Sequence, residues 1–397
     1  MNLRREKLFA VLISLALLEC PHDGRGEEPQ ATATKLFPFH EGGKDGKWGY
    51  INRNGEVVVP PRFTYAKDFS DGLARFVDGT SRGFLDTQGK VAFMLEGELK
   101  DVYWVWRFSE GLAEFSKKDK CGFIDRKGKI MVPAEYDKSD SFSDGLAGVN
   151  IGAKPDNTPP RPTLKVGGKW GFIDKTGALA IPIQFEYVDR FSDGLALVRI
   201  GDKFVYIDKT GKTKITLEYE QDDPMRWIGS AAPFSEGLAR INIMGHKDQF
   251  NGFIDQSGSF VIQPQFEWAG NFAEGLAPVG VNKRWGYMDK SGRIVIPPQF
   301  DDARAFAEGL AAVQKGKHWC FIDKTGKTLI SGPFNDADRF SGGLARVHEG
   351  GRFDHYPDGP AQWSGGAWYY INSKGEKIRR CREDDVYGAD GYGREVR

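Results

Sequence analysis

Histidine and aspartate side chains gather in one stretch near the C-terminus. His348 is followed by Asp354, His355, Tyr356 and Asp358. Imidazole and carboxylate groups are common metal ligands, and two of each could in principle hold one ion. Their spacing matches no known metal-binding template, so we expect a solvated loop, with no metal and no other cofactor. Asp354, His355 and Tyr356 are kept as candidates for contact with a binding partner, because inserted loops on repeat scaffolds commonly bind.

Tryptophan side chains supply the other candidate binding chemistry. Trp104 and Trp106 replace the proline-containing segment of one repeat, and Trp227 lies in an insertion between Glu220 and Ala232. If these indoles are exposed, they could stack on a sugar or a peptide. The alternative is that they pack in the core or cap it.

Catalytic templates are missing from the sequence. The chain has no GxSxG elbow, HExxH pair, P-loop or dinucleotide-binding glycine pattern, and its 6 histidines are scattered. We therefore expect no enzymatic activity. The 55 basic and 55 acidic residues cancel, so the composition does not indicate a nucleic-acid partner.

The element that must position these residues is a short repeat. The pattern Phe-x-x-Gly-Leu-Ala occurs eight times, and three of the intervals between its glycines are 34 residues long. A period of this length is typical of stacked or ring-closed arrays, in which a unit buries its apolar face only against neighbours. The glycines of this pattern are Gly72, Gly111, Gly145, Gly194, Gly237, Gly275, Gly309 and Gly343.

Each unit predicts three short strands. In the unit that begins at Lys169, the segment Asp174-Lys175-Thr176-Gly177 joins two apolar runs by a tight turn. The Asp side chain can accept hydrogen bonds from the backbone of that turn, which explains its repetition without any chemistry. Proline follows or interrupts most of the second strands, so those strands end there or lie at an edge. No long stretch has helical periodicity, so we expect an all-β fold.

Comparison of the copies predicts the core. One aromatic residue per copy never becomes polar, and the Phe and Leu of Phe-x-x-Gly-Leu-Ala do not vary. The position two residues before that aromatic holds Trp in some copies but Arg82 or Asn251 in others, so we expect it near solvent. A bulge at Gly171 or a rim position for the Trp would then explain why Trp170 and Phe172 differ in burial.

The repeated segments resemble a known family. Lys47 to Asn52, Lys169 to Asp174 and Arg284 to Asp289, each followed by Pro-x-Phe-like and Phe-x-x-Gly-Leu-Ala segments, are similar to the bacterial WG repeat, also called the KWG repeat. The resemblance covers residues 44–378. It implies an array of β repeats, common in envelope and secreted proteins, with no general activity, cofactor or catalytic residue.

For the arrangement of the units we favour an open β-hairpin solenoid, with a closed β-propeller as the alternative. The unit of 34 residues is shorter than the 40 or more usual for a four-stranded propeller blade. We expect eight copies and a C-terminal half copy in residues 44–378, a flexible tether in 21–43 and a disordered tail in 379–397.

The N-terminus predicts an export signal in residues 1–20. Basic residues precede an apolar run from Leu8 to Leu18 that is too short to span a bilayer comfortably. Leu17-Leu18-Glu19-Cys20 resembles a lipoprotein box, in which Cys20 would be lipidated and would give the only membrane attachment. Cys121 and Cys320 are expected to be reduced and partly buried thiols.

These features together favour an exported, non-catalytic repeat protein that is periplasmic, attached to the cell envelope or extracellular. It would act as a binding or scaffold module, and its partner would be a protein or an envelope glycan. The alternatives are a loop-borne enzyme or inhibitor activity and a purely structural spacer.

Overall fold

The computed structural model describes residues 35–155, 165–218, 227–245, 248–354 and 362–383. Within these ranges the chain forms antiparallel strands and two short 3-10 helices, η1 (Gly43–Asp45) and η2 (Gly97–Leu99). A helix long and apolar enough to cross a membrane is not found in them. The expected all-β tandem-repeat fold is confirmed.

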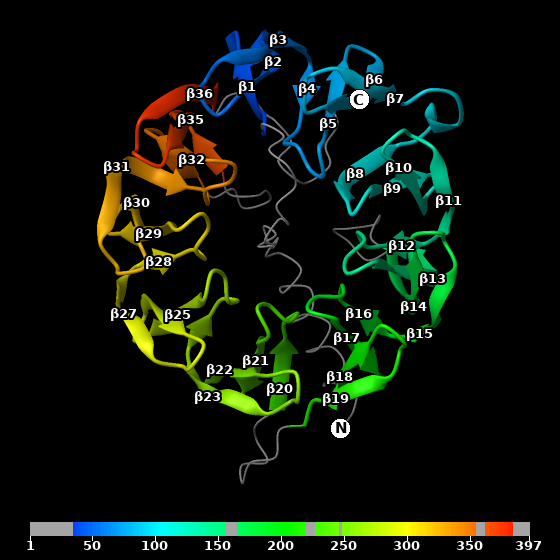
Figure 1. Ribbon diagram of the computed structural model, residues 1–397, viewed down its shortest axis with the longest axis vertical. Coiled ribbons are helices and arrows are strands. Elements are labelled where there is room, and N and C mark those ends of the chain that lie inside the picture. The colour runs from blue at the N-terminus through cyan, green and yellow to red at the C-terminus, as the bar shows by residue number, and fades with distance from the viewer. Residues whose placement is uncertain (1–34, 156–164, 219–226, 246–247, 355–361, 384–397) are drawn as a thin grey trace. The chain divides into compact units, whose positions relative to one another are not determined.

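The strands form successive meanders, which we call modules 1 to 9 (Figure 1). Module 1 contains β1 (Phe37–Glu41), β2 (Lys47–Ile51) and β3 (Val57–Phe63). Module 2 contains β4 (Tyr65–Ala66), β5 (Leu73–Asp78), β6 (Ser81–Asp86) and β7 (Val91–Met94). Module 3 contains β8 (Trp104–Ser109), β9 (Leu112–Lys117), β10 (Lys120–Asp125) and β11 (Ile130–Tyr136).

The central modules repeat this plan. Module 4 contains β12 (Lys138–Ser139), β13 (Leu146–Pro155), β14 (Lys165–Asp174) and β15 (Leu179–Phe185). Module 5 contains β16 (Tyr187–Val188), β17 (Leu195–Ile200), β18 (Lys203–Asp208) and β19 (Thr213–Thr216). Module 6 contains β20 (Trp227–Ala231), β21 (Ala239–Met244), β22 (Gln249–Ile254) and β23 (Phe260–Phe266). Module 7 contains β24 (Trp268–Ala269), β25 (Leu276–Val281), β26 (Arg284–Asp289) and β27 (Ile294–Phe300).

The last two modules share one long strand. Module 8 contains β28 (Asp302–Ala303), β29 (Ala311–Lys315), β30 (His318–Ile322) and the first part of β31 (Thr328–Ala337). Module 9 contains the end of β31, β32 (Leu344–Glu349), β35 (Ala367–Asn372) and β36 (Lys377–Glu383). A separate hairpin is formed by β33 (Arg352–Asp354) and β34 (Gln362–Ser364).

A module holds one strand more than the sequence predicts. The three expected strands begin at the Leu of Gly-Leu-Ala, at the Trp-Gly segment and after the Asp-x-x-Gly turn, as in β17, β18 and β19. A first strand of only two residues, such as β16, pairs with the second strand. It is too short to produce a detectable alternation of polar and apolar residues.

The repeat of the sequence spans two modules of the structure. Its Trp-Gly strand and the strand after it, such as β14 and β15, end one module, whereas its Gly-Leu-Ala strand, such as β17, belongs to the next. Aromatic side chains join the two halves. Phe172 of β14 packs against Phe191, which precedes β17, with ring centroids 4.9 Å apart. The hydrophobic cores therefore lie between neighbouring modules, so each module depends on the next for burial.

The predicted core is confirmed with one partial exception. All nine aromatic residues that follow the Trp-Gly positions and all eight leucines are buried, and Phe69 alone of the eight phenylalanines is half-buried. The Trp position does not generally lie near solvent, because five of its nine side chains are buried and the other four, Arg82, Trp170, Phe204 and Trp285, are half-buried. Asn251 is 2% exposed there, and its side-chain amide donates to the carbonyls of Phe266 and Glu267 at 3.2 and 3.0 Å. Polar residues are tolerated because backbone acceptors are within reach.

The expected bulge at Gly171 is confirmed. Trp170 pairs with Phe185 and Phe172 with Ile181, so the partner strand carries two extra residues opposite Gly171. A Cβ on Gly171 would lie 2.6 Å from the carbonyl oxygen of Ile181. Copy five, which has Val205 in this position, lacks that bulge, because Val205 pairs directly with Thr216.

The first and last modules contact each other. Strand β1 lies beside β36 (Figure 1), and Phe37 packs on Tyr370 with ring centroids 5.4 Å apart. The hydroxyl of Tyr370 donates to the carbonyl of Pro38 at 2.9 Å, and a buried cluster combines residues of β1, β2, β32, β35 and β36. The sequence left two arrangements open, an open solenoid and a closed β-propeller. The closed arrangement requires contacts between the two ends of the array, and such contacts are present.

A second set of contacts repeats around the whole series. In each module the glycine of the Asp-x-x-Gly turn packs on a side chain from the last strand of the preceding module, and in module 1 this partner is Ile378 of module 9. The contacts are Gly89 on Val59, Gly128 on Phe93, Gly177 on Val132, Gly211 on Ile181, Gly258 on Ile215, Gly292 on Ile262, Gly326 on Ile296, Gly375 on Ile330 and Gly55 on Ile378. Each module, including the first and the last, therefore contacts one module on either side.

Strands β1 and β36 occupy segments that the sequence assigned elsewhere. Residues 37–41 were expected in the tether, and residues 379–383 in the disordered tail. Both segments form strands because each pairs with the Trp-Gly strand of its own module, β1 with β2 and β36 with β35. Neither segment carries a repeat motif of its own, so the pairing could not be read from the motif.

Candidate functional site

The acid that precedes the glycine in seven of the eight Gly-Leu-Ala turns connects neighbouring modules. Asp193 has a left-handed backbone, with φ at 53°, and its carboxylate accepts the backbone N–H of Gly237 in the next module at 2.7 Å. Equivalent bonds join Asp71 to Gly111, Glu110 to Gly145, Asp144 to Gly194, Glu236 to Gly275, Glu274 to Gly309 and Glu308 to Gly343. These carboxylates are occupied in holding modules together, beyond the turn-forming role that their sequence position indicates.

The Asp of the Asp-x-x-Gly turn behaves as predicted. The carboxylate of Asp174 accepts the backbone N–H groups of Thr176 and Ala178 at 2.8 and 3.1 Å, and these bonds lower the pKa of Asp174 together with one from the Thr176 hydroxyl. Both sets of repeated acids therefore serve the fold.

A different position in each repeat combines a fixed backbone with a changing side chain. It lies two residues before the Phe of Phe-x-x-Gly-Leu-Ala. We call these residues the variable row: Lys67, Trp106, Asp140, Asp189, Ala232, Gly270, Arg304 and Asp338. Except at Trp106, the structure shows their backbone N–H donating to a carbonyl of the neighbouring strand at 2.7 to 3.0 Å. This backbone bond is therefore kept whether the side chain is basic, acidic or small.

The variable row is continuous across modules where its side chains are long enough to meet. The guanidinium of Arg304 in module 8 binds Asp338 of module 9 at 3.1 Å and Asp336 at 2.7 Å. Asp338 in turn accepts from Arg346 at 2.8 Å, and Arg346 lies 3.8 Å from Asp68 of the first repeat. An ion-pair network therefore also connects the two ends of the array.

Trp106 is the exposed aromatic residue of the variable row, with 40% of its surface accessible. Val105 pairs with Phe115 and Phe108 with Ala113, so Trp106 and Arg107 bulge opposite the single residue Glu114. Trp106 packs on Trp104 edge to face, with ring centroids 6.1 Å apart. Because of the bulge, the Trp106 indole lies at the surface and is not part of the core.

Trp104 and Trp227 do not present free aromatic faces. Trp104 is half-buried, and the side chains of Arg75 and Lys67 lie 4.4 and 4.9 Å from its ring centroid. Trp227 is half-buried in β20, where it pairs with Met244. Of the three predicted tryptophans, the structure places Trp104 and Trp106 together and Trp227 three modules away.

Glu114 lies opposite Trp106 in the ladder between β8 and β9, and its carboxyl group interacts with that of Asp140. Glu114 is 8% exposed, and burial together with the nearby Asp140 carboxyl raises the pKa of Glu114 from 4.5 to about 8. Burial and the neighbouring Asp189 raise the pKa of Asp140 to about 6. Burial and Glu114 also raise the pKa of the Cys121 thiol to about 12, so this thiol is not an activated nucleophile.

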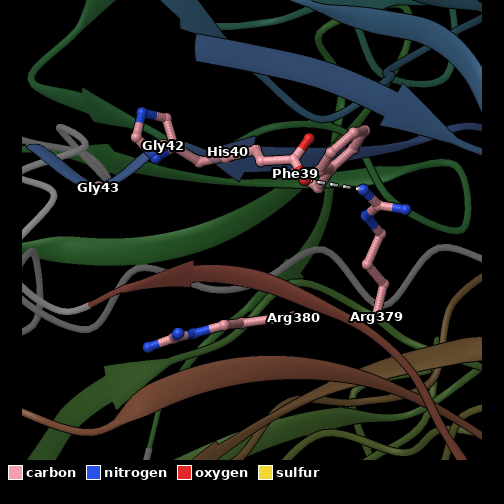
Figure 2. Close-up of a pocket in the computed structure, with 7 residues that line it drawn as sticks. Phe39, His40, Gly42, Gly43, Arg379 and Arg380 are labelled. Atoms are coloured by element: carbon pink, nitrogen blue, oxygen red, sulfur yellow. Dashed lines mark ion pairs between the residues drawn. The ribbon is translucent and has the colours of Figure 1, made fainter. Parts of the chain in front are cut away.

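A cleft of about 350 Å³ lies where the two ends of the array meet. Figure 2 shows Arg379 beside Phe39, and the Arg379 guanidinium lies 4.0 Å from the Phe39 ring centroid. The same guanidinium lies 3.6 Å from the Glu41 carboxylate. The lining residues are Phe39, His40, Glu41, Gly42, Gly43, Arg379 and Arg380.

The remaining predicted sites are only partly visible. Asp354 is the last residue of β33, and His355, Tyr356 and Cys20 lie outside the described residues. His348 is fully buried and packs on Trp368, with ring centroids 5.2 Å apart. In the described part of the chain no three His, Cys, Asp or Glu residues are grouped to hold a metal ion. Cys121, Cys320 and Cys381 are free and buried, as expected for the first two.

Sequence reasoning missed Glu114, Asp140 and the rest of the variable row. The position varies between copies whereas the Phe two residues later does not, but the residue between them varies as well, so the sequence alone does not single out this row.

The fold and its repeated motif define a protein of the tandem WG-repeat class. The profile of the WG containing repeat matches residues 48–79, 122–154, 170–204, 206–245, 252–285, 285–319 and 319–353. These segments make up more than half of the chain, which therefore belongs to the WG repeat family. A comparison with curated proteins finds no match.

Similarity to solved structures is weak. A protein of unknown function from Bacteroides caccae is 13% identical, with a TM-score of 0.27, over 54% of this chain and 90% of that one. Regucalcin from Agrobacterium tumefaciens, a calcium-binding protein, is 15% identical, with a TM-score of 0.28, over 55% and 82%. Prolyl oligopeptidase B from Galerina marginata is 10% identical, with a TM-score of 0.41, over 73% and 52%. At these values none of the three informs the function of this chain.

Proposed function

We propose that this protein is an exported, non-catalytic binding module and that its ligand is an envelope glycan. The observation that carries the proposal is Trp106, an exposed indole held in a bulge of β8 opposite Glu114. An aromatic face packs against the apolar face of a sugar. A protein partner is the alternative, since Trp is also enriched in protein interfaces.

The repeated architecture supports a binding role without supplying catalysis. The acids of the turns accept backbone N–H groups, and the half-buried ion pair of Arg304 with Asp338 connects two modules. A fixed backbone with a variable side chain provides specificity at low cost in stability, because the site is pre-organised. Attachment to a membrane through a lipid at Cys20 and location in the periplasm, on the envelope or outside the cell belong to the same proposal.

The test compares two exposed tryptophans. W106A removes the proposed contact, and W268A is the matched control, because Trp268 is 37% exposed and stacks on Trp285. Co-sedimentation of the full chain with insoluble bacterial cell-wall glycan should weaken at least about tenfold for W106A and remain unchanged for W268A. Equal binding by both variants would exclude Trp106 as the site. Absence of glycan binding by the unchanged protein, with specific capture of a protein from envelope extract, would support the alternative partner.

A further inference from the structure

One copy of the repeat departs from the others in two adjoining segments. Its Trp position, in strand β6 of module 2, holds Arg82, whereas five of the nine copies hold Trp there. In the segment that follows, Trp104 and Trp106 replace the proline-containing part of the repeat. The contacts of Arg82 connect these two departures.

Arg82 joins module 2 to the segment that leads into β8 of module 3. Its guanidinium donates to the carbonyl of Val102 at 2.9 Å and to that of Lys100 at 3.0 Å. Val102 is 1% exposed and lies two residues before Trp104, so the chain enters β8 from a fixed point. A Trp side chain has a single N–H donor, whereas a guanidinium has several in a planar fork. Arg at this position therefore suits the segment that replaces the usual one.

A second arginine of module 2 holds the ring on which Trp106 packs. The Arg75 guanidinium lies 4.4 Å from the ring centroid of Trp104, and the Lys67 ammonium lies 4.9 Å from it. The two cations come from neighbouring strands, because the Lys67 N–H donates to the Arg75 carbonyl at 3.0 Å. Arg75 is 3% exposed, and the attraction between a cation and an aromatic face is stronger when the pair is removed from water.

Trp106 needs such support because regular strand pairing does not fix it. Trp104 pairs with Ser116 and Val105 with Phe115, but the register resumes only at Phe108. A bulge re-aims the side chains of its residues and leaves them out of the ladder. The direction of the Trp106 indole is therefore restricted by its edge-to-face contact with Trp104, which module 2 holds in place.

We propose that Arg82 and Arg75 are positioning residues for the binding face of Trp106, so that this face requires modules 2 and 3 together. Arg82 places the backbone at the start of β8, and Arg75 holds the Trp104 ring. The inference rests on the proposed glycan-binding function. An aromatic contact that is ordered before the ligand arrives loses less conformational entropy on binding.

Fluorine NMR of the full chain labelled with fluorotryptophan tests the positioning without any ligand. R82A should shift or broaden the resonances of Trp104 and Trp106, which W104F and W106F assign. The resonances of Trp268 and Trp285, a stacked pair in module 7, should remain unchanged and provide an internal reference. R82K keeps one donor group and should restore the resonances in part. Unchanged resonances of Trp104 and Trp106 in R82A would overturn the proposal.

Two further variants complete this test. R293A is the matched control, because the Arg293 side chain is 78% exposed and pairs with Asp289 of its own turn, and it should change none of the four resonances. R75M keeps most of the volume of the buried Arg75 side chain without its charge and should shift the Trp104 resonance. No shift in R75M would exclude the role of Arg75.

Binding separates this inference from the proposed function. R82A should weaken co-sedimentation with insoluble cell-wall glycan by about fivefold, a smaller loss than that of W106A because the indole remains. Full binding by R82A would contradict the positioning role. If the unchanged protein binds no glycan while R82A still shifts the two resonances, the proposed ligand is wrong and the positioning by Arg82 is supported.

Discussion

Gly55, in the first Asp-x-x-Gly turn, packs on Ile378 in the last strand of the array. A Cβ on Gly55 would lie 2.9 Å from Ile378 Cγ2. The same contact, between a turn glycine and a side chain of the preceding module, occurs at all the other junctions between modules. The first and last modules therefore share this contact with the other neighbouring pairs, although no peptide bond links them.

The turn glycines predict a stability difference that depends on this packing. Gly258 and Gly237 both have positive φ, 87° and 84°, but a Cβ on Gly258 would lie 2.8 Å from Ile215 Cγ2, whereas one on Gly237 would meet nothing within 4 Å. Both alanine variants carry backbone strain, and G258A adds a steric clash. In urea titrations G258A should lose about 1 to 2 kcal/mol more than G237A. Equal losses would show that the contact between modules is not tight.

The acid of the Gly-Leu-Ala turn has two separable roles. D193N should be the mildest change at this position, because Asn tolerates the left-handed backbone and still offers an oxygen to the Gly237 N–H. D193G keeps the backbone but removes the bond, at about 1 kcal/mol. D193A removes the bond and adds strain, so its loss should be the largest of the three in chemical denaturation. Similar stabilities for D193A and D193N would contradict the bridging role.

Asn251 should be intolerant of an apolar replacement although it occupies a position that often holds Trp. N251L leaves the carbonyls of Phe266 and Glu267 without their donor, at about 1 to 3 kcal/mol. F204L, in the equivalent position of another copy, involves no such bond and should cost less. Thermal unfolding of the two variants measures the difference, and a neutral N251L would be inconsistent with the hydrogen bonding described.

The raised pKa of Glu114 predicts how the free energy of unfolding changes with pH. Its pKa is about 8 in the folded protein and about 4.5 when unfolded, so between these values the folded state binds more protons and the free energy of unfolding falls as pH rises. The upper limit of this contribution is about 5 kcal/mol, at about 1.4 kcal/mol per unit. E114Q removes it, so the variant should lose less stability than the unchanged protein between pH 5 and 8. Superimposable pH profiles would show that Glu114 is not buried as described.

The sequence predicted the repeated frame well because each prediction rested on local chemistry. The Asx bonds of Asp174, the bulge at Gly171 and the burial of Phe172 all depend on neighbours in the sequence or in the adjacent strand. The copies supplied independent versions of the same constraint. Positions that never change could therefore be assigned to turns and core without an alignment.

What the sequence did not show depends on contacts across long distances along the chain. Phe37 and Tyr370 meet only because the ends of the array come together, and neither strand β1 nor strand β36 carries the motif. The burial of Asn251 could not be predicted, because its hydrogen-bond acceptors, Phe266 and Glu267, lie at the end of the next strand and just after it. The variable row could not be recognised from the sequence, because its members share a position beside the neighbouring strand and not a residue type.

The distance between Arg53 and Glu376 tests the closure of the array most directly. Both residues are exposed, and each stands two positions before a member of the Gly55 and Ile378 contact. Leu179 and Lys209 flank the equivalent contact of Ile181 and Gly211 and provide an internal reference. Spin labels at residues 53 and 376 should give a narrow distance distribution that matches the one from residues 179 and 209. A longer and broader distribution for the first pair alone would contradict the closed series.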